Sequence, residues 1–452
     1  MQHAITPVVP TTRITLAACL GARLAFAQAT PPGTPADEPD VEEAAEPAAS
    51  ESAPPIEPAT SESAPPIEPA TSETDSVFAE LEQDLSTPGS APASPTRAAP
   101  ARGTQSMNPD LALIADFAAA WFSDEEHRQT GGHDPSRNGF NLQSLELNAR
   151  SVVDPYLRFD ANLVFAEAGV EIEEVYATTL ELPQGLQARF GQFLTRFGRI
   201  NATHPHAWDF ADQPFAIGRV FGAEGNRGLG VELSWLLPLP WYAELVASAT
   251  QAGGEASARS FYGANDLGVE RPADLLYVTA LEQFFDLSHD WSLLWGLSGA
   301  FGPNASGRDN RTEVFGTDLY LKYRPITRTS ATSVGWQTEL LYRRRQVPED
   351  VLWDASGYSQ VAVRFARRWG SALRYEAGSP AYDLGGAVAT DPLDPEWTRF
   401  RHRVSANLTH WPSEFSRFRL QGSRDMGGAG QPIWAAFLAA EVVVGAHGAH
   451  TF

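Results

Sequence analysis

The 452-residue sequence predicts an all-β fold, a transmembrane antiparallel β-barrel of about 16 strands that follows a disordered N-terminal extension. Three observations predict it. Segments of about ten residues alternate apolar and polar side chains, tight turns alternate with long polar connections, and the polar face of many segments is charged. A period of two places successive side chains on opposite faces of a strand. A long series of such segments is typical of a barrel in a bacterial outer membrane.

Residues 1–27 have the features of a secretory signal peptide. An arginine precedes an apolar stretch over residues 14–27, which ends in a small-x-small cleavage site, Ala-Phe-Ala. Cys19 closes a Leu-Ala-Ala-Cys sequence that also resembles a lipoprotein cleavage box. Lipoprotein cleavage would leave Cys19 as the first residue of the mature chain, whereas cleavage after Ala27 would remove it, so lipidation at Cys19 stays open.

Residues 28–106 form a low-complexity segment rich in Pro, Ala, Ser and Glu. Between Gln28 and Thr96 it holds fifteen Asp and Glu residues and no Lys or Arg. An eleven-residue unit at 50–60 repeats unchanged at 61–71. Such a composition buries too little apolar surface to offset the chain entropy lost on folding, so we expect a disordered, acidic periplasmic segment.

Residues 107–452 form the predicted barrel. The alternating segments that we assign as strand cores are 111–122, 140–151, 156–166, 171–182, 186–194, 228–237, 241–250, 274–286, 291–302, 313–324, 334–345, 358–368, 371–378, 399–410, 415–424 and 433–445. Connections after even-numbered strands are mostly tight, whereas those after odd-numbered strands are mostly long and polar. Because short connections of such barrels face the periplasm, both termini are predicted to be periplasmic.

The two faces of the strands differ in polarity. In the third strand Leu157, Phe159 and Leu163 alternate with Arg158 and Asp160. A charge that faces the middle of a bilayer costs about 2–4 kcal/mol, so the charged face is predicted to line a wet lumen. Six tryptophans near strand ends or in loops are predicted to lie at the membrane interfaces: Trp208, Trp241, Trp291, Trp369, Trp397 and Trp411.

The same alternation predicts that six arginines project into the lumen from neighbouring strands: Arg364, Arg374, Arg401, Arg403, Arg417 and Arg419. Guanidinium groups stay ionised, and charged rings tune the selectivity of pores. One interpretation is therefore a basic wall that attracts anions. The alternative is a structural network in which acidic side chains pair with these arginines.

Composition and motifs exclude several classes of protein. The net charge of −23 argues against nucleic acid as a partner, because phosphate contacts need clustered cations. Cys19 is the only cysteine, which excludes a disulfide framework in the barrel. The sequence contains no run of about twenty uncharged apolar residues, so it predicts no transmembrane helix. Nucleophile-elbow, phosphate-loop and zinc-protease motifs are absent from the sequence, so we predict no enzyme.

His402 falls on the predicted lipid face, and the pattern offers no reason for it.

The long connection at 195–227 is the best candidate site, because it mixes aromatic and charged residues. Its candidate pore-lining residues are Arg196, Arg199, His204, His206, Asp209 and Asp212. Sixteen strands with a long third external loop resemble the bacterial porins, in which that loop folds inward and narrows the pore. The sequences Arg-Phe-Gly-Gln-Phe at 189–193 and His-Pro-His-Ala-Trp-Asp-Phe at 204–210 resemble porin-like barrels related to the phosphate-selective porins, often labelled zinc-regulated outer-membrane receptors.

That resemblance covers about residues 138–240. It implies an outer-membrane porin of a Gram-negative bacterium, with outer-membrane lipid and small hydrophilic solutes as partners and a homotrimer as the assembly. Passive diffusion of such solutes, anions among them, is the predicted function. The alternative is a closed barrel that binds or anchors a partner, and a weaker alternative is an outer-membrane enzyme that modifies lipid.

His204 and His206 are weak candidates for a metal site. Two imidazoles at i and i+2, with Asp209 or Asp212 nearby, could ligate zinc. The alternative is that this segment packs against the barrel wall, with Pro205 fixing the backbone. No cofactor is predicted.

Overall fold

The computed structural model describes residues 109–124, 126, 128–167, 169–265, 267–325, 332–427 and 431–445. The signal peptide predicted at 1–27, with Cys19, and the acidic segment predicted at 28–106 lie outside the described residues. The chain divides into two units, of which the second begins at Arg97. All described residues belong to the second unit, which is the barrel.

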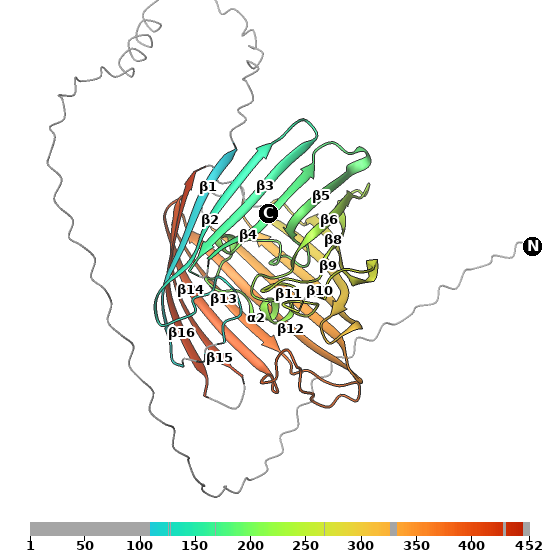
Figure 1. Ribbon diagram of the computed structural model, residues 1–452. Coiled ribbons are helices and arrows are strands. Elements are labelled where there is room, and N and C mark those ends of the chain that lie inside the picture. The colour runs from blue at the N-terminus through green and yellow to red at the C-terminus, as the bar shows by residue number, and fades with distance from the viewer. Residues whose placement is uncertain are drawn as a thin grey trace, which may run out of the picture. The chain divides into compact units, whose positions relative to one another are not determined.

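Sixteen antiparallel strands close into one barrel, in which each strand pairs with its neighbours in sequence and β1 pairs with β16 (Figure 1). The strands are β1 (Asp110–Phe122), β2 (Gly139–Val152), β3 (Leu157–Ala166), β4 (Gly169–Thr179), β5 (Leu186–Leu194), β6 (Arg227–Leu236), β7 (Tyr242–Gln251), β8 (Leu275–Asp286), β9 (Trp291–Asn304), β10 (Gly307–Tyr323), β11 (Ser333–Val347), β12 (Asp350–Ala366), β13 (Trp369–Gly378), β14 (Arg401–Ser413), β15 (Ser416–Met426) and β16 (Ile433–Gly445). The predicted fold class is confirmed.

The predicted boundaries fail most at the starts of two strands. β10 begins at Gly307 and β12 at Asp350, well before the predicted 313 and 358. These extra residues pair with the backbones of β9 and β11 although they do not follow the apolar alternation. Backbone hydrogen bonds alone hold a strand beyond the apolar belt, so a search for alternating side chains misses it.

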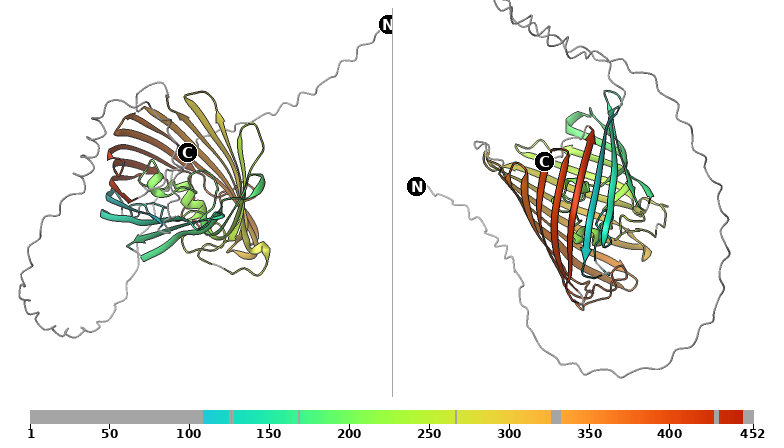
Figure 2. Two further views of the ribbon diagram at one scale, coloured as in Figure 1. Left: turned by 90° about the horizontal axis from the view of Figure 1, so that it is seen from above. Right: turned by 90° about the vertical axis from the view of Figure 1, so that its left-hand side faces the viewer.

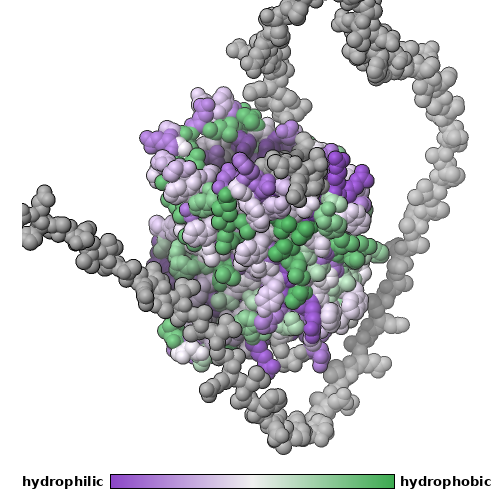
Figure 3. Space-filling model, turned by 180° about the vertical axis from the view of Figure 1, so that it is seen from behind, coloured by the Kyte–Doolittle hydropathy of each residue, from purple (hydrophilic) through white to green (hydrophobic). Residues whose placement is uncertain are grey.

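The barrel is apolar outside and charged inside, as predicted. Leu373 and Leu420 point outward and are 57% and 58% exposed, whereas Asp160 and Glu232 point inward and are buried. Apolar residues cross the middle of the outer surface and hydrophilic residues lie toward its ends (Figure 3). Aromatic pairs such as Trp291 with Tyr323 lie at the end with the tight turns. We call this the short-turn end and the opposite one the long-loop end.

His402 lies on the outer face, where it hydrogen-bonds the hydroxyl of Tyr375 and packs against the ring of Phe400. Tyr375 on the neighbouring strand thus gives the histidine a polar partner, which explains how a histidine is accommodated on the outer face.

The lumen differs from the prediction in one respect, since part of it is a dry core. Loop 3 (residues 195–226), between β5 and β6, contains the short helices η2 (Pro205–Ala207) and α2 (Phe215–Phe221). All seven residues of α2 are buried, and the helix lies within the ring of strands (Figure 2). The other short helices are η1 (Pro183–Gly185) and η3 (Pro272–Asp274). No helix in the described part of the chain is long and apolar enough to cross a membrane.

Candidate functional site: loop 3 and the barrel lumen

Loop 3 crosses the lumen and is bound to the inner wall at widely separated points. The backbone N–H of Gly198 donates to Ser298 Oγ on β9 at 2.9 Å. The N–H of Ile200 donates to Glu339 on β11 at 2.8 Å, and that of Phe215 donates to Glu376 on β13 at 2.7 Å. A loop inside a barrel has no neighbouring strand to pair with, so side chains on the wall accept the hydrogen bonds of these N–H groups.

An apolar core fixes loop 3 to the wall formed by β8 to β12. Phe197 and Phe221 stack edge to face with ring centroids 4.8 Å apart. The side chains they meet include Leu276 and Val314, both fully buried. Inward-facing apolar residues on these strands thus mark the side of the barrel that loop 3 covers.

Gly222 ends α2 with a positive φ of 103°. A Cβ there would lie 2.5 Å from the carbonyl oxygen of Ala256. The helix therefore needs glycine at this position to turn back toward β6.

Two of the predicted arginines bind one pair of carboxylates on the opposite side of the lumen. Arg374 pairs with Asp212 at 2.6 Å and with Glu376 at 3.0 Å. Arg403 pairs with Glu376 at 2.6 Å and with Asp212 at 3.4 Å. All four side chains are at most 2% exposed. Burial would raise the pKa of Asp212, but the two guanidinium groups hold it below its usual value.

The other four predicted arginines are placed differently. Arg401 pairs with Asp425, and Arg417 pairs with Glu441. Arg417 and Arg419 also donate to the carbonyl oxygen of Trp208 in loop 3, at 3.0 and 2.8 Å. The exposed Arg364 stacks over the ring of Trp411, away from loop 3. Five of the six arginines therefore pair with carboxylates or bond to loop 3, an arrangement that favours the structural alternative, and Arg364 does neither.

Trp208 and Trp397 do not lie at a membrane interface, so the prediction for these two residues was wrong. Both pack against the apolar core inside the barrel, and Trp397 stacks edge to face on Phe215. Their position in loops beside strand ends resembles that of interfacial tryptophans, but the loops fold inward.

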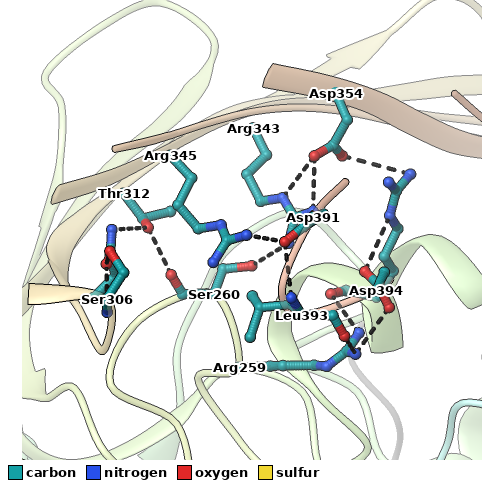
Figure 4. A network of polar contacts seen from close by, with 12 residues as sticks. Arg259, Ser260, Ser306, Thr312, Arg343, Arg345, Asp354, Asp391, Leu393 and Asp394 are labelled. Carbon is teal, nitrogen blue, oxygen red and sulfur yellow. Dashed lines mark hydrogen bonds and ion pairs between the residues drawn. The ribbon is translucent and has the colours of Figure 1, made fainter. Parts of the chain in front are cut away.

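A second buried ion-pair network lies toward the long-loop end, where it joins β11 and β12 to loop 7, and sequence reasoning missed it (Figure 4). Arg343 on β11 pairs with Asp354 on β12 at 2.7 Å and with Asp391 at 2.9 Å. Asp391 belongs to loop 7 (residues 379–400) and also pairs with Arg345. Arg343 and Arg345, at i and i+2 on one face of a strand, could have indicated such a network. Nothing in the sequence identifies Asp391, in a distant loop, as their partner.

The remaining predicted residues of loop 3 lie on its short-turn side. Arg196 pairs with Glu232 and Glu244, each at 3.1 Å. The guanidinium of Arg199 lies over the ring of Tyr320, 4.1 Å from its centroid. Charged side chains of loop 3 therefore face acidic and aromatic side chains of β6, β7 and β10.

The two histidines meet a group of glutamates on β2 and β4. His204 Nδ1 lies 2.9 Å from Glu173 Oε2, and its Nε2 lies 3.0 Å from Glu174 Oε2. His206 Nδ1 lies 2.9 Å from Glu146 Oε2. Burial lowers the pKa of His204, but Glu173 and Glu146 outweigh it, so the pKa is raised well above its usual value.

A β-bulge brings two consecutive glutamates to this group. The register of β3 with β4 shifts between Asn162 and Leu163, which leaves Glu173 without a partner opposite it. Glu173 and Glu174 are both buried as a result. Strict alternation would have turned one of these charges toward lipid, so adjacent glutamates in a predicted strand are a sequence signal for the bulge.

His133, in loop 1 (residues 123–138), joins the same group from the long-loop side. Its Nε2 lies 3.3 Å from Glu224, and its Nδ1 lies 3.4 Å from the carbonyl oxygen of Gln143. Burial lowers the pKa of His133, but Glu224 outweighs it and raises the pKa to about 10. Two sets of side chains offer atoms close enough to share a cation, one with His133, Glu173 and Glu224 and the other with Glu146, Glu173 and His204.

Two cavities lie on either side of loop 3. The cavity toward the short-turn end measures about 1080 Å³, and among its lining residues are Arg196, Arg199 and Asp209. The cavity toward the long-loop end measures about 1050 Å³, and Arg219 and Gly222 line it. The two linings share no residue of the described chain, so loop 3 divides the lumen.

Comparisons with known proteins agree with this architecture. No protein-family model matches the chain. A protein of Aquifex aeolicus (strain VF5), described only as uncharacterized, is 34% identical over 351 residues, which are 69% of this chain and 72% of that protein.

Among solved structures, the outer membrane channel DcaP of Acinetobacter baumannii has a TM-score of 0.52 at 12% identity and covers 74% of this chain and 97% of its own. The trimer form of OmpT, an outer membrane protein of Vibrio cholerae, has a TM-score of 0.48 at 10% identity and covers 74% and 99%. At such identity the likeness to DcaP establishes the fold alone.

Proposed function

The chain belongs to the same family as the uncharacterized Aquifex aeolicus protein, and from the lumen of its barrel we propose that it is an outer-membrane channel for passive diffusion of small hydrophilic solutes. The observation that supports this most is the division of a polar lumen by loop 3 into cavities of about 1080 and 1050 Å³. A barrel with water-accessible space on both sides of an inward loop needs only a narrow passage at that loop to conduct. DcaP, which has this fold, is an outer membrane channel.

The outer surface supports a place in the outer membrane. Its exposed leucines and phenylalanines would face lipid, and the aromatic pairs at the short-turn end would lie at one interface. Ala112 near the start of β1 pairs with Gly445 at the end of β16, so both ends of the barrel sequence lie at the short-turn end. We propose that this end faces the periplasm.

Within loop 3 we propose two roles for the six residues that the sequence singled out. Arg196, Arg199, His204 and Asp209 line the cavity at the short-turn end and would meet a passing solute. His206 also lines it but is mostly buried against the wall. Asp212 is fully buried and serves to hold the loop in place.

The charge balance argues against a strong preference for anions. Nine carboxylates and five arginines line the cavity at the short-turn end. The most buried arginines of the supposed basic wall are paired with Asp212, Glu376 and Asp425. The narrower resemblance to the phosphate-selective porins, and the homotrimer that it implies, remain predictions.

Planar-bilayer recording of the purified barrel tests the proposal. Stepwise conductance is expected from the wild type, and deletion of residues 202–214 with a short glycine linker should raise the size of each step. Strand content and heat-dependent gel mobility must match the wild type, so that the comparison is made on a folded barrel.

A closed barrel that binds or anchors a partner is the second candidate, because the two cavities share no lining residue. It predicts a silent wild type and a conducting deletion variant. A silent wild type in a folded barrel would contradict the channel, and a conducting wild type would contradict the closed barrel.

A further inference from the structure

Three side chains from three different elements converge beside the cavity at the short-turn end. Glu146 on β2, Glu173 on β4 and His204 in loop 3 offer ligand atoms that lie within 4.8 Å of one another. His204 Nδ1 lies 2.9 Å from Glu173 Oε2 and 3.7 Å from Glu146 Oε1. A tetrahedral ion with bonds of about 2.0–2.2 Å keeps its ligand atoms about 3.3–3.6 Å apart. The distance from His204 to Glu146 is close to that spacing, the distance to Glu173 would have to lengthen by about half an ångström, and all ligand atoms of the group already lie within 4.8 Å of one another.

One candidate ligand atom in this group is buried and accepts no hydrogen bond in the described part of the chain. Glu146 is 4% exposed, and its Oε2 accepts a hydrogen bond from His206. Its Oε1 has no hydrogen-bond partner among the described residues, and it faces His204. A buried carboxylate oxygen without a partner is costly, and a cation would satisfy it.

The surrounding residues orient the ligand atoms as the outer partners of metal sites do. Glu174 Oε2 accepts from His204 Nε2 at 3.0 Å, which turns Nδ1 of that ring toward Glu173 and Glu146. Glu174 is itself fixed, because its Oε1 accepts from the backbone N–H of Leu194 at 2.8 Å. A carboxylate behind an imidazole ligand sets the ring orientation and strengthens metal binding.

The charge of the group also calls for a cation. Glu146, Glu173 and Glu174 bring three buried carboxylates to His204 and His206. A metal ion on His204 Nδ1 would replace the proton that this atom shares with Glu173, and that proton would leave to water in the cavity. Buried charges are stable only when they are paired or bound to a metal. Since Glu146 and His204 also line the cavity of about 1080 Å³, an ion can reach the group from solvent.

We propose that Glu146, Glu173 and His204 bind one divalent transition-metal cation of the zinc class, with water from the cavity as a further ligand. Imidazole with carboxylate oxygens suits zinc and its neighbours. Glu174 and His206 are positioning residues in this site. The ion would join loop 3 to β2 and β4. The site stands whether or not the barrel conducts, because it rests only on the side chains that surround it.

Equilibrium binding to the untagged full chain in detergent, stripped with a chelator, tests the proposal with Zn²⁺ alone. We expect one Zn²⁺ per chain. Glu173→Gln and His204→Asn should each weaken binding at least tenfold. Glu171→Gln is the matched control, since Glu171 lies on the same strand but pairs with Arg227 and should leave the affinity unchanged.

Cobalt tests the roles of the outer residues. The visible absorption of bound Co²⁺ should change in Glu174→Gln, with an affinity loss of about 10–100-fold. If a ligand variant fails to fold, X-ray absorption of the wild type with zinc decides by itself. The expected spectrum contains imidazole nitrogen and carboxylate oxygen in the first shell. The proposal is overturned if the wild type binds no zinc, if Glu173→Gln binds it equally well, or if the spectrum lacks imidazole.

Discussion

Asp212 is the carboxylate through which loop 3 is held to the wall formed by β13 to β15. It accepts from Arg374 Nη2 and from Gln421 Nε2, each at 2.6 Å, and it lies 3.4 Å from Arg403. Asp212→Asn keeps the shape of the side chain and removes its charge. We predict that this one change loosens loop 3 while the barrel stays folded.

The magnitude follows from the charges that remain. Arg374, Arg403, Asp212 and Glu376 form a buried set of two positive and two negative groups. In the variant Glu376 is the remaining carboxylate that pairs with both guanidinium groups. Removing one partner of a buried ion pair costs about 3–5 kcal/mol. Because asparagine can still accept one hydrogen bond, we expect about 3 kcal/mol, which is roughly a 100-fold rise in the undocked population.

Hydrogen exchange of three loop amides measures this population, because side chains of other segments hold those amides only while loop 3 is docked. The N–H groups of Ala211, Gln213 and Phe215 donate to Gln421, Asp134 and Glu376. Their exchange should accelerate by about two orders of magnitude, with strand amides unchanged, as expected for a local cost of about 3 kcal/mol.

Asp209→Asn is the matched control. Asp209 lies three residues away in the same loop, is exposed, and accepts from the neutral side chain of Gln360 at 3.2 Å. Its variant should leave exchange within a fewfold of the wild type. If Asp212→Asn leaves the three amides as well protected as before, the ion pairs do not hold the loop, and the apolar core alone accounts for its position.

Three further predictions concern pH, the N-terminal segment and selectivity. His133, with its pKa raised to about 10, stabilises the docking of loop 1 fully below pH 6.5 and loses this contribution as the pH rises through about 10. Protease cleavage in loop 1 should therefore increase between pH 7 and 10 in the wild type but not in His133→Gln. Deletion of residues 28–100 should leave strand content and heat-dependent gel mobility intact, because that composition has little to bury. In a gradient of potassium chloride at low salt, the reversal potential should favour cations, because nine carboxylates face five arginines in the short-turn cavity. A preference for chloride would contradict this prediction and would support the interpretation of the arginines as a basic wall that attracts anions.

The barrel itself was predictable because each strand carries its own information. Period-two alternation, together with the cost of placing Asp160 or Glu232 against lipid, decides which face points inward without reference to any distant residue. The ends of β10 and β12 were not predictable in this way. Beyond the apolar belt neither face has to be apolar, so backbone pairing continues without a side-chain signal.

The partners in the lumen could not be predicted, because they depend on the path of the loops. Arg374 and Arg403 were identified from the sequence, but Asp212 meets Arg374 across 162 positions of the chain. The histidine site shows the same limit. His204 was a candidate, whereas nothing in the sequence connected Glu146 and Glu173 with it, because the bulge in β4 and the course of loop 3 bring the three together.

The three edges of loop 3 differ in what can release them. Toward β8 to β12 it is held by a core that includes Phe197 and Phe221, which neither salt nor pH weakens directly. Toward β13 to β15 it is held by fully buried ion pairs such as Arg374 with Asp212, which salt screens little. Toward β2 and β4 it is held by His204 among glutamates, beside an open cavity. His204, Glu146 and Glu174 at this third edge line that cavity, whereas Asp212, Arg374 and Arg403 line neither cavity. We therefore expect a change in proton or zinc concentration to act first on the edge at β2 and β4, so the amides of loop 3 near His204 should change their rate of hydrogen exchange before those of Ala211, Gln213 and Phe215 do.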